Sequence, residues 1–229
     1  MAARVLVVDD EPGIRRVLTG YLEAAGFEVS EAATGEDAVA RVRRSAPDVV
    51  LLDVMLPDVD GIEVLRRLRT FSDVYVLLVT ARAEETDTLV GLAVGADDYV
   101  TKPFSPREVV ARVKAVLRRG RGGERHNGRL HFASLTIDPG SREVDAAGQA
   151  VSLSALEFDL LLALASAPGR VFSRRQLLER VWGGDFYGDE RVIDVHIRSI
   201  RKHLGDDATS PRIIATARGV GYKFVLDPA

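Results

Sequence analysis

Short apolar runs and amphipathic segments alternate along the first 120 residues. The strand-like runs lie at 5–8, 27–32, 48–53, 74–80 and 97–101. Between and after them, apolar residues recur every three or four positions, which predicts helices at 12–25, 36–45, 61–70, 84–94 and 106–119. Strands that are apolar on both faces and alternate with helices are typical of a parallel sheet covered on both sides. We therefore predict an α/β domain with a doubly wound, five-stranded parallel sheet.

A glycine-rich stretch interrupts this pattern. Residues 120–128 contain four glycines in nine positions and show no hydrophobic periodicity, which indicates a flexible linker. We therefore divide the chain into a first domain at 1–120, a linker at 121–128 and a second domain at 129–229.

The second domain follows a different pattern. Residues 129–153 alternate between apolar and polar positions, which predicts a small antiparallel sheet. Helical periodicity and capping signals then predict helices at 154–169, 173–183 and 190–204, and a hairpin follows at 212–226. A sheet, three helices and a hairpin in this order predict a winged helix-turn-helix domain.

Composition narrows the class of protein. Hydrophobic residues make up 46% and charged residues 28% of the 229 positions, as in soluble globular proteins. There is no apolar run near 18 residues, so we expect no membrane span. The N-terminus leads directly into a strand pattern without the features of a signal peptide, and the absence of cysteine excludes disulfides and thiolate metal sites. We expect a cytoplasmic protein.

The net charge of −3 conceals an uneven distribution. Residues 1–120 carry 16 basic and 20 acidic side chains, whereas residues 121–229 carry 15 and 14. Within the second part, seven basic residues and only four acids fall between 190 and 223. Positive charge is therefore concentrated near the C-terminus, where it favours an anionic partner.

Polar residues stand at the ends of four predicted strands of the first domain. With strand order 2-1-3-4-5, these ends converge at the topological switch point, where ligands bind in open α/β sheets. The residues are Asp9, Asp10, Asp53, Thr80 and Lys102. Three carboxylates suit Mg²⁺, and a lysine and a hydroxyl complete the groups that stabilise a phosphoryl group during transfer. Asp53 is the candidate nucleophile, because carboxylates form aspartyl phosphates.

Other interpretations of these acids remain open. A single aspartate at a strand end is often only a helix cap, and Asp10 ahead of Pro12 suits that role. A phosphatase with an aspartate nucleophile usually needs a second acid two residues later, but Met55 stands there. A third possibility is a constitutive DNA-binding protein whose first domain never accepts phosphate. We expect no enzymatic activity beyond Mg²⁺-dependent phosphorylation and dephosphorylation of the chain itself.

Basic side chains lie on the predicted helix 190–204. Its apolar positions recur every three or four residues and leave most basic side chains on the opposite face, as in a helix that enters a major groove. The candidate contacts are Arg191, His196, Arg198, Ser199, Arg201 and Lys202. Arg218, at the tip of the hairpin, could enter a minor groove. The alternative is a solvated basic helix without a ligand.

The segments VVDDEP, DVVLLDVMLPDVDG, LLVTA and GADDYVTKPF, with their spacings, resemble the receiver domain of two-component response regulators. The resemblance implies that Asp53 accepts a phosphoryl group from a sensor histidine kinase. It implies Mg²⁺ ligation by Asp10, Asp53 and the carbonyl of Met55, with Asp9 assisting. Thr80 and Lys102 would contact phosphoryl oxygens, and Tyr99 would turn inward on activation.

The segments LSALEFDLLLALASAPGRVFSRRQLLERVWG, VIDVHIRSIRKHLG and IIATARGVGYKF resemble the effector domain of the OmpR/PhoB subfamily. This resemblance implies a homodimer that forms on phosphorylation, binds direct repeats in double-stranded DNA and contacts RNA polymerase through 183–189. It adds Thr216 to the DNA contacts and places Trp182 beside the DNA backbone, although the size and apolar neighbours of Trp182 favour a core position.

The chain departs from the subfamily at two positions. Ser199 stands at a base-reading position where several members have arginine, so the recognised sequence cannot be transferred from them. Thr88 stands where a basic residue usually pairs with Glu108 across the dimer. The other dimer residues implied by the resemblance are Asp97, Asp98, Arg112 and Arg119. We therefore expect a weaker dimer.

Overall fold

The computed structural model describes residues 2–81, 94–122, 128–182 and 190–229. The chain forms two compact units, Met1–Arg118 and Arg119–Ala229, and each is considered by itself. Residues 84–93 of the predicted helix at 84–94, which include Thr88, lie outside the described residues, and so does the predicted polymerase-contact loop 183–189.

The first unit contains the predicted five-stranded parallel sheet. Its strands are β1 (Arg4–Val8), β2 (Glu28–Ala32), β3 (Val49–Asp53), β4 (Tyr75–Thr80) and β5 (Asp98–Thr101). They lie in the order β2-β1-β3-β4-β5, which confirms the predicted topology. All residues of β3 and β4 are buried, as expected for central strands that helices cover on both faces.

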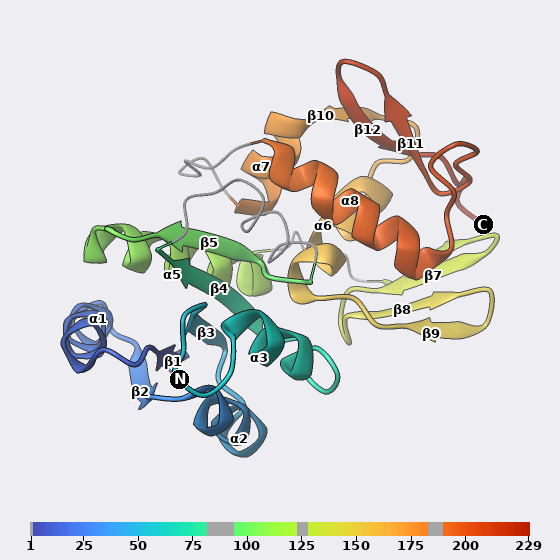
Figure 1. Cartoon of the computed structure of the whole chain (residues 1–229). Helices are drawn as coiled ribbons and strands as arrows, with labels where there is room; N and C mark the ends of the chain where they lie inside the picture. Colours follow the sequence, from blue (N-terminus) through green and yellow to red (C-terminus); the bar gives the residue numbers. More distant parts are fainter. Residues whose placement is uncertain (1, 82–93, 123–127, 183–189) are drawn as a thin grey trace. The chain divides into compact units, whose positions relative to one another are not determined.

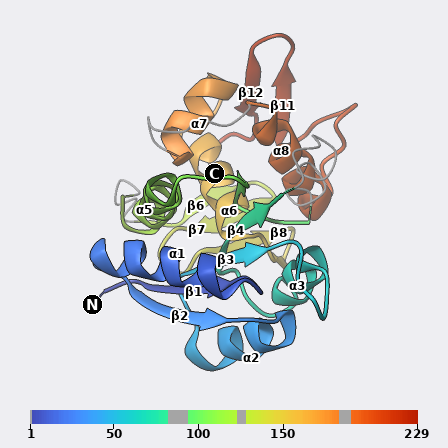
Figure 2. The ribbon, with the colours of Figure 1, turned by 60° about the vertical axis from the view of Figure 1, so that its left-hand side comes forward.

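Helices cover both faces of this sheet. The described helices are α1 (Pro12–Ala24), α2 (Gly35–Ser45), α3 (Gly61–Leu68) and α5 (Pro106–Gly122). Helices α1 and α5 lie on one face, and α2 and α3 lie together on the other (Figures 1 and 2). Helix α5 continues through Gly122, so residues 121 and 122, which we assigned to the linker, are helical.

The second unit begins with an antiparallel sheet. Its strands are β6 (Leu130–Phe132), β7 (Leu135–Asp138), β8 (Glu143–Ala146) and β9 (Gln149–Val151), in chain order. The helices α6 (Ala155–Ala165), α7 (Arg174–Trp182) and α8 (Arg191–Leu204) follow. A second sheet has the order β10-β12-β11, from β10 (Val171–Ser173), β11 (Ile214–Ala217) and β12 (Gly221–Phe224). This is the predicted winged helix-turn-helix arrangement.

Two details of the second unit differ from the prediction. Helix α6 begins with the predicted capping box of Ser154 and Glu157, but it ends at Ala165 rather than at Gly169. The N–H of Gly169 donates to the carbonyl of Phe224 at 2.8 Å, so this glycine contacts the second sheet instead of ending the helix. The short strand β10 that follows was not predicted, because three residues are too few to show an alternating pattern.

The core of the second unit surrounds α6, whose side chains are buried on nearly all sides. Trp182 is 1% exposed, which confirms the core position favoured by its size. Within the part of the chain that the structure describes, none of the helices combines the length and the apolar character needed to cross a bilayer.

Candidate functional site

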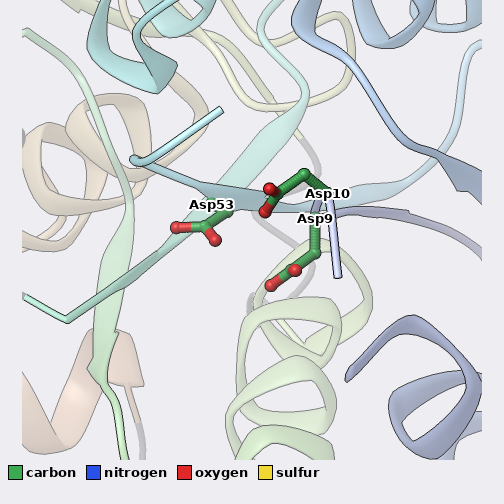
Figure 3. A group of neighbouring side chains, drawn as sticks. All are labelled: Asp9, Asp10 and Asp53. Carbon is green, nitrogen blue, oxygen red and sulfur yellow. The ribbon is translucent and has the colours of Figure 1, made fainter. Parts of the chain in front are cut away.

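Three aspartates gather at the carboxyl ends of β1 and β3 (Figure 3). Val8 of β1 lies opposite Leu52 of β3, so the residues that follow them, Asp9 and Asp53, come out at the same edge of the sheet. Carboxylate oxygens of Asp9, Asp10 and Asp53 lie within 4.8 Å of one another. Asp9 and Asp53 are buried, whereas Asp10 is exposed.

Lys102 provides positive charge between the two buried acids. Its ammonium donates to Asp9 Oδ2 at 2.9 Å and to Asp53 Oδ2 at 2.7 Å, and it lies 3.9 Å from Glu11 Oε1. The backbone N–H of Lys102 donates to the carbonyl of Thr80 at 2.7 Å, which fixes the lysine beside the end of β4. The ammonium therefore offsets the repulsion between carboxylates that the sequence places side by side.

Burial and charge act in opposite directions on the pKa values of this site. Burial is the largest influence on Asp53 and raises its pKa, and the hydrogen bonds from Lys102 and from the N–H of Met55 only partly oppose it. For Lys102, burial disfavours the charged form, but the bonds to Asp53 and Asp9 outweigh it and raise its pKa. The lysine therefore stays charged at neutral pH.

The backbone around Asp53 holds its carboxylate in one orientation. The N–H of Met55 donates to Asp53 Oδ1 at 3.0 Å, while Oδ2 faces Lys102. Gly61, the first residue of α3, lies directly against this turn, and a Cβ there would stand 2.2 Å from the carbonyl oxygen of Asp53. Only glycine permits that approach.

Arg15 supports the acidic turn and was missed at the sequence level. Its guanidinium donates to the carbonyls of Asp9 at 2.6 Å and Asp10 at 3.0 Å, and it pairs with Glu31 Oε2 at 3.2 Å. Thr19 donates to the other oxygen of Glu31 at 2.7 Å. Helical periodicity places Arg15 on α1, but no local pattern links it to the preceding carbonyls.

The other residues predicted for this site lie near the same edge. Thr80 ends β4 and is buried, and Tyr99 on β5 is half-buried. The roles of Thr80, Tyr99 and the carbonyl of Met55 stay predictions. The alternative role of Asp10 as a helix cap is wrong, because the N-cap residue of α1 is Glu11.

The donor set fits Mg²⁺. This ion prefers oxygen ligands, binds through a few carboxylates and keeps several waters. Asp9, Asp10 and Asp53 offer carboxylate oxygens close enough to share one ion, and the exposed side chain of Asp10 leaves room for water.

The predicted dimer residues form ion pairs within the first unit. The Arg112 guanidinium donates to both oxygens of Asp98, at 2.9 and 3.1 Å, and to Glu108 Oε1 at 2.9 Å. Burial disfavours the charge of Arg112, but these two carboxylates outweigh it and raise its pKa. The side chain of Arg119 lies outside the described part of the structure.

The prediction that Asp97 contacts a partner across a dimer is wrong. Its carboxylate is fully buried and accepts bonds from Arg69 Nη2 at 2.8 Å and from the N–H of Val76 at 2.7 Å. Arg69 also binds the carbonyls of Gly95 and Val74. Asp97 therefore joins α3 to β4 inside its own unit.

The basic residues of α8 lie on two faces. Arg191, Arg198 and Lys202 are exposed and, at 100° per residue, lie within a narrow sector of the helix. Ser199 is half-buried beside them. Thr216 on β11 and Arg218 at the following turn are also exposed. Six of the eight residues predicted to contact DNA are therefore exposed or half-buried.

Two predicted DNA contacts are wrong. His196 is fully buried, with its ring centroid 6.1 Å from that of Trp182, because it lies on the face of α8 that packs into the core. Arg201 is only 9% exposed, and its guanidinium donates to the carbonyl of Ile214 at 2.7 Å and to Thr216 Oγ1 at 2.9 Å. Helical periodicity alone could not show that His196 packs into the core or that Arg201 packs against β11.

Comparisons with known proteins agree with this architecture. Residues 5–114 match the response regulator receiver domain, and residues 148–224 match the C-terminal domain of transcriptional regulatory proteins. The chain is 44% identical over 223 residues to the DNA-binding response regulator MtrA of Mycolicibacterium smegmatis, with 97% of both chains covered. It is 43% identical over 231 residues to the transcriptional regulatory protein SrrA of Staphylococcus aureus, covering 98% of this chain and 96% of the relative.

Solved structures give the same result. The response regulator DrrB of Thermotoga maritima, an OmpR/PhoB homologue, is 38% identical with a TM-score of 0.54, covering 98% of this chain and all of its own. A variant of RitR is 26% identical with a TM-score of 0.83, covering 97% of this chain and 99% of its own. The chain belongs to the DNA-binding response regulators of the OmpR/PhoB subfamily.

Proposed function

We propose that the chain is a transcription regulator switched by phosphorylation of Asp53. The observation that carries the proposal is the meeting of Asp9, Asp10 and Asp53 beside Lys102 at one edge of the sheet. The donor is a sensor histidine kinase, as expected for a receiver domain. We expect no other enzymatic activity than the phosphorylation and dephosphorylation of this aspartate.

Each residue of the site has a separate role in the transfer of the phosphoryl group to Asp53. A carboxylate oxygen of Asp53 forms the new bond to phosphorus while the P–N bond of the donor histidine breaks, and the imidazole keeps that electron pair. The N–H of Met55 holds the other carboxylate oxygen in place. Lys102 moves its hydrogen bonds to a phosphoryl oxygen, and the hydroxyl of Thr80 orients another. Asp9, Asp10 and Asp53 would hold Mg²⁺, which would supply positive charge to stabilise the transferred group.

The charge added at Asp53 biases the first unit between two states and favours a dimer. Because Arg112 is already paired with Asp98 and Glu108 within one chain, pairing across the dimer exchanges partners and gains little free energy. We therefore expect a weak homodimer, which places two exposed α8 faces on direct repeats in double-stranded DNA. Contact with RNA polymerase through 183–189 is part of the same proposal.

Phosphorylation is tested by intact mass after incubation with Mg²⁺ and acetyl phosphate. The expected result is one added phosphoryl group, absent without Mg²⁺ and absent in Asp53→Asn. Asp60→Asn is the matched control, because Asp60 is exposed and caps α3, and asparagine caps a helix equally well. An unmodified chain, or an adduct that persists in Asp53→Asn, would show a DNA-binding protein that phosphate on Asp53 does not control.

DNA binding is tested by selecting duplexes from a random double-stranded pool, with and without prior phosphorylation. We expect paired, directly repeated half-sites and tighter binding by the phosphorylated chain. Ultracentrifugation of the phosphorylated chain measures the dimer. A chain that stays monomeric at all concentrations, or selected sites without a repeat, would contradict the dimer.

A further inference from the structure

The helix that carries the exposed basic residues also has a second polar face, directed to the sheet β10-β12-β11. Asp194 and Arg201 lie seven residues apart on α8, so they are stacked two turns apart on the same side. Both bind the sheet: Asp194 through Tyr222 of β12, and Arg201 through Ile214 and Thr216 of β11. These contacts join the helix to the hairpin that carries Arg218.

Tyr222 lies between the charged groups of two helices. Its hydroxyl donates to Asp194 Oδ1 at 2.7 Å, and the same oxygen accepts from Arg174 Nε of α7 at 2.7 Å. The guanidinium carbons of Arg174 and Arg201 lie 5.4 and 5.6 Å from the centre of its ring. Burial is the main cause that raises the pKa of Tyr222 to about 12, with the bond to Asp194 adding to it, so the hydroxyl remains a donor.

Arg201 holds the other strand of the hairpin. Its Nε and Nη2 donate to the carbonyl of Ile214 at 3.2 and 2.7 Å, and Nη2 also reaches Thr216 Oγ1 at 2.9 Å. Thr216 is paired with Tyr222 in the register of β11 and β12, so both anchors act at the same level of the hairpin. A lysine could not reproduce this forked geometry.

The contacts made by Arg201 and Tyr222 lie close to the exposed tip of the hairpin between β11 and β12. Only Ala217 separates Thr216 from Arg218, and Gly219, with φ +72°, completes the turn that returns the chain to β12. Ordering such a hairpin on binding would cost conformational entropy, whereas a hairpin fixed in advance avoids that cost. The position of Arg218 relative to the exposed face of α8 therefore depends on Asp194, Arg201 and Tyr222.

We propose that Asp194, Arg201 and Tyr222 are positioning residues that fix the hairpin tip relative to the exposed face of α8, so that Arg218 and that face bind one stretch of DNA together. The proposal rests on the DNA binding proposed above. In it, Arg201 acts on DNA affinity through the hairpin, and its own guanidinium stays on Ile214 and Thr216.

The test is a set of double-mutant cycles on one duplex, recovered from a random pool by the phosphorylated wild-type chain. Tyr222→Phe removes only the hydroxyl and keeps the buried ring, and Arg201→Lys keeps the charge but loses the fork. We expect each to weaken binding about tenfold, within the range of measured coupling between contacting residues. In an Arg218→Ala background the same substitutions should have little further effect. In an Arg198→Ala background, on the other face, their full effect should remain.

A second measurement follows the hairpin in the free full-length chain. Amide hydrogen exchange at 216–220 should become faster in Tyr222→Phe and Arg201→Lys, while exchange in α6 stays as in the wild type. Equal loss of affinity in the Arg218→Ala and Arg198→Ala backgrounds, or unchanged exchange at the hairpin, would overturn the proposal. Failure of the wild-type chain to select any duplex, or full binding by Arg198→Ala, would instead contradict DNA binding through α8.

Discussion

The two units use charged side chains in opposite ways. In the first, four charged residues from three strand ends converge on one edge, and two of the acids are buried against Lys102. In the second, the charged residues of the single helix α8 diverge to an exposed face and a face against the hairpin. Sheet topology determines the first arrangement, whereas packing of neighbouring elements determines the second.

The largest expected effect on stability comes from substituting two glycines, one in each unit, that a backbone carbonyl approaches closely. A Cβ on Gly61 would stand 2.2 Å from the carbonyl oxygen of Asp53, and a Cβ on Gly221 would stand 2.0 Å from that of Phe172. In both places packed backbone would have to move to admit the new Cβ. Gly61→Ala and Gly221→Ala should therefore each lower the free energy of unfolding by about 3 kcal/mol or more.

The single tryptophan separates the two units in this experiment. Trp182 belongs to the second unit, so its fluorescence during urea unfolding should shift in Gly221→Ala and stay unchanged in Gly61→Ala. Circular dichroism should report the loss in both. Gly20→Ala is the control, because nothing lies within 4 Å of its Cβ and alanine stabilises a helix by about 0.5–1 kcal/mol. A fluorescence shift in Gly61→Ala would mean that the units do not unfold separately.

Lys102→Met should have the next largest effect. It leaves Asp9 and Asp53 buried without a positive partner, which should destabilise the first unit by about 2–3 kcal/mol, somewhat less than a fully buried broken pair because Lys102 retains some exposure. Mg²⁺ should restore more stability to this variant than to the wild type, since no ammonium competes for the carboxylates.

Thermal unfolding with increasing Mg²⁺, followed by circular dichroism, measures both effects. Lys114→Met is the matched control, because Lys114 is exposed on α5 of the same unit and should change stability by less than about 0.5 kcal/mol. The same stabilisation by Mg²⁺ in Lys102→Met and in the wild type would mean that Lys102 does not share the metal ligands.

The difference between the two units explains why the sequence predicted most of the site in the first unit but not the two polar faces of α8. Alternation of strands and helices predicts a parallel sheet but not the order of its strands. Once the order 2-1-3-4-5 is taken for such a sheet, Asp9, Asp53, Thr80 and Lys102 come to one edge, and the structure has this order. The role of Arg15 was not predicted, because its partners are the backbone carbonyls of Asp9 and Asp10 and no pattern of residue types indicates such contacts. On α8, periodicity separates apolar from polar positions, but it cannot tell which polar face meets solvent and which meets β11.

Arg201 and Arg198 test that distinction directly, because they are the same residue type on the same helix. Arg201→Ala leaves the carbonyl of Ile214 without its charged donor and should cost the second unit about 2 kcal/mol. Arg198→Ala removes an exposed side chain and should change stability by less than about 0.5 kcal/mol. Urea unfolding followed by Trp182 fluorescence gives both values, and equal effects would refute the assignment of the two faces.

The smallest expected effect on stability concerns Asp138, a half-buried acid of the second unit that pairs with the exposed Arg129. Arg129 is the main cause, with the N–H groups of Ser141 and Gly140, that lowers the pKa of Asp138 from 3.8 to about 2. A carboxyl group whose pKa is lower in the folded chain than in the unfolded chain stabilises the fold at pH values above its unfolded pKa. This stabilisation is lost as the pH falls through its folded pKa. The wild type should therefore be slightly more stable than Asp138→Asn at pH 7, and the difference should vanish between about pH 4 and 2. Added salt should reduce this difference, because the Arg129 partner of Asp138 is exposed and the pair is screened. A difference in Trp182-detected stability that stays constant from pH 7 to pH 2 would show that the loss in Asp138→Asn does not come from the charge.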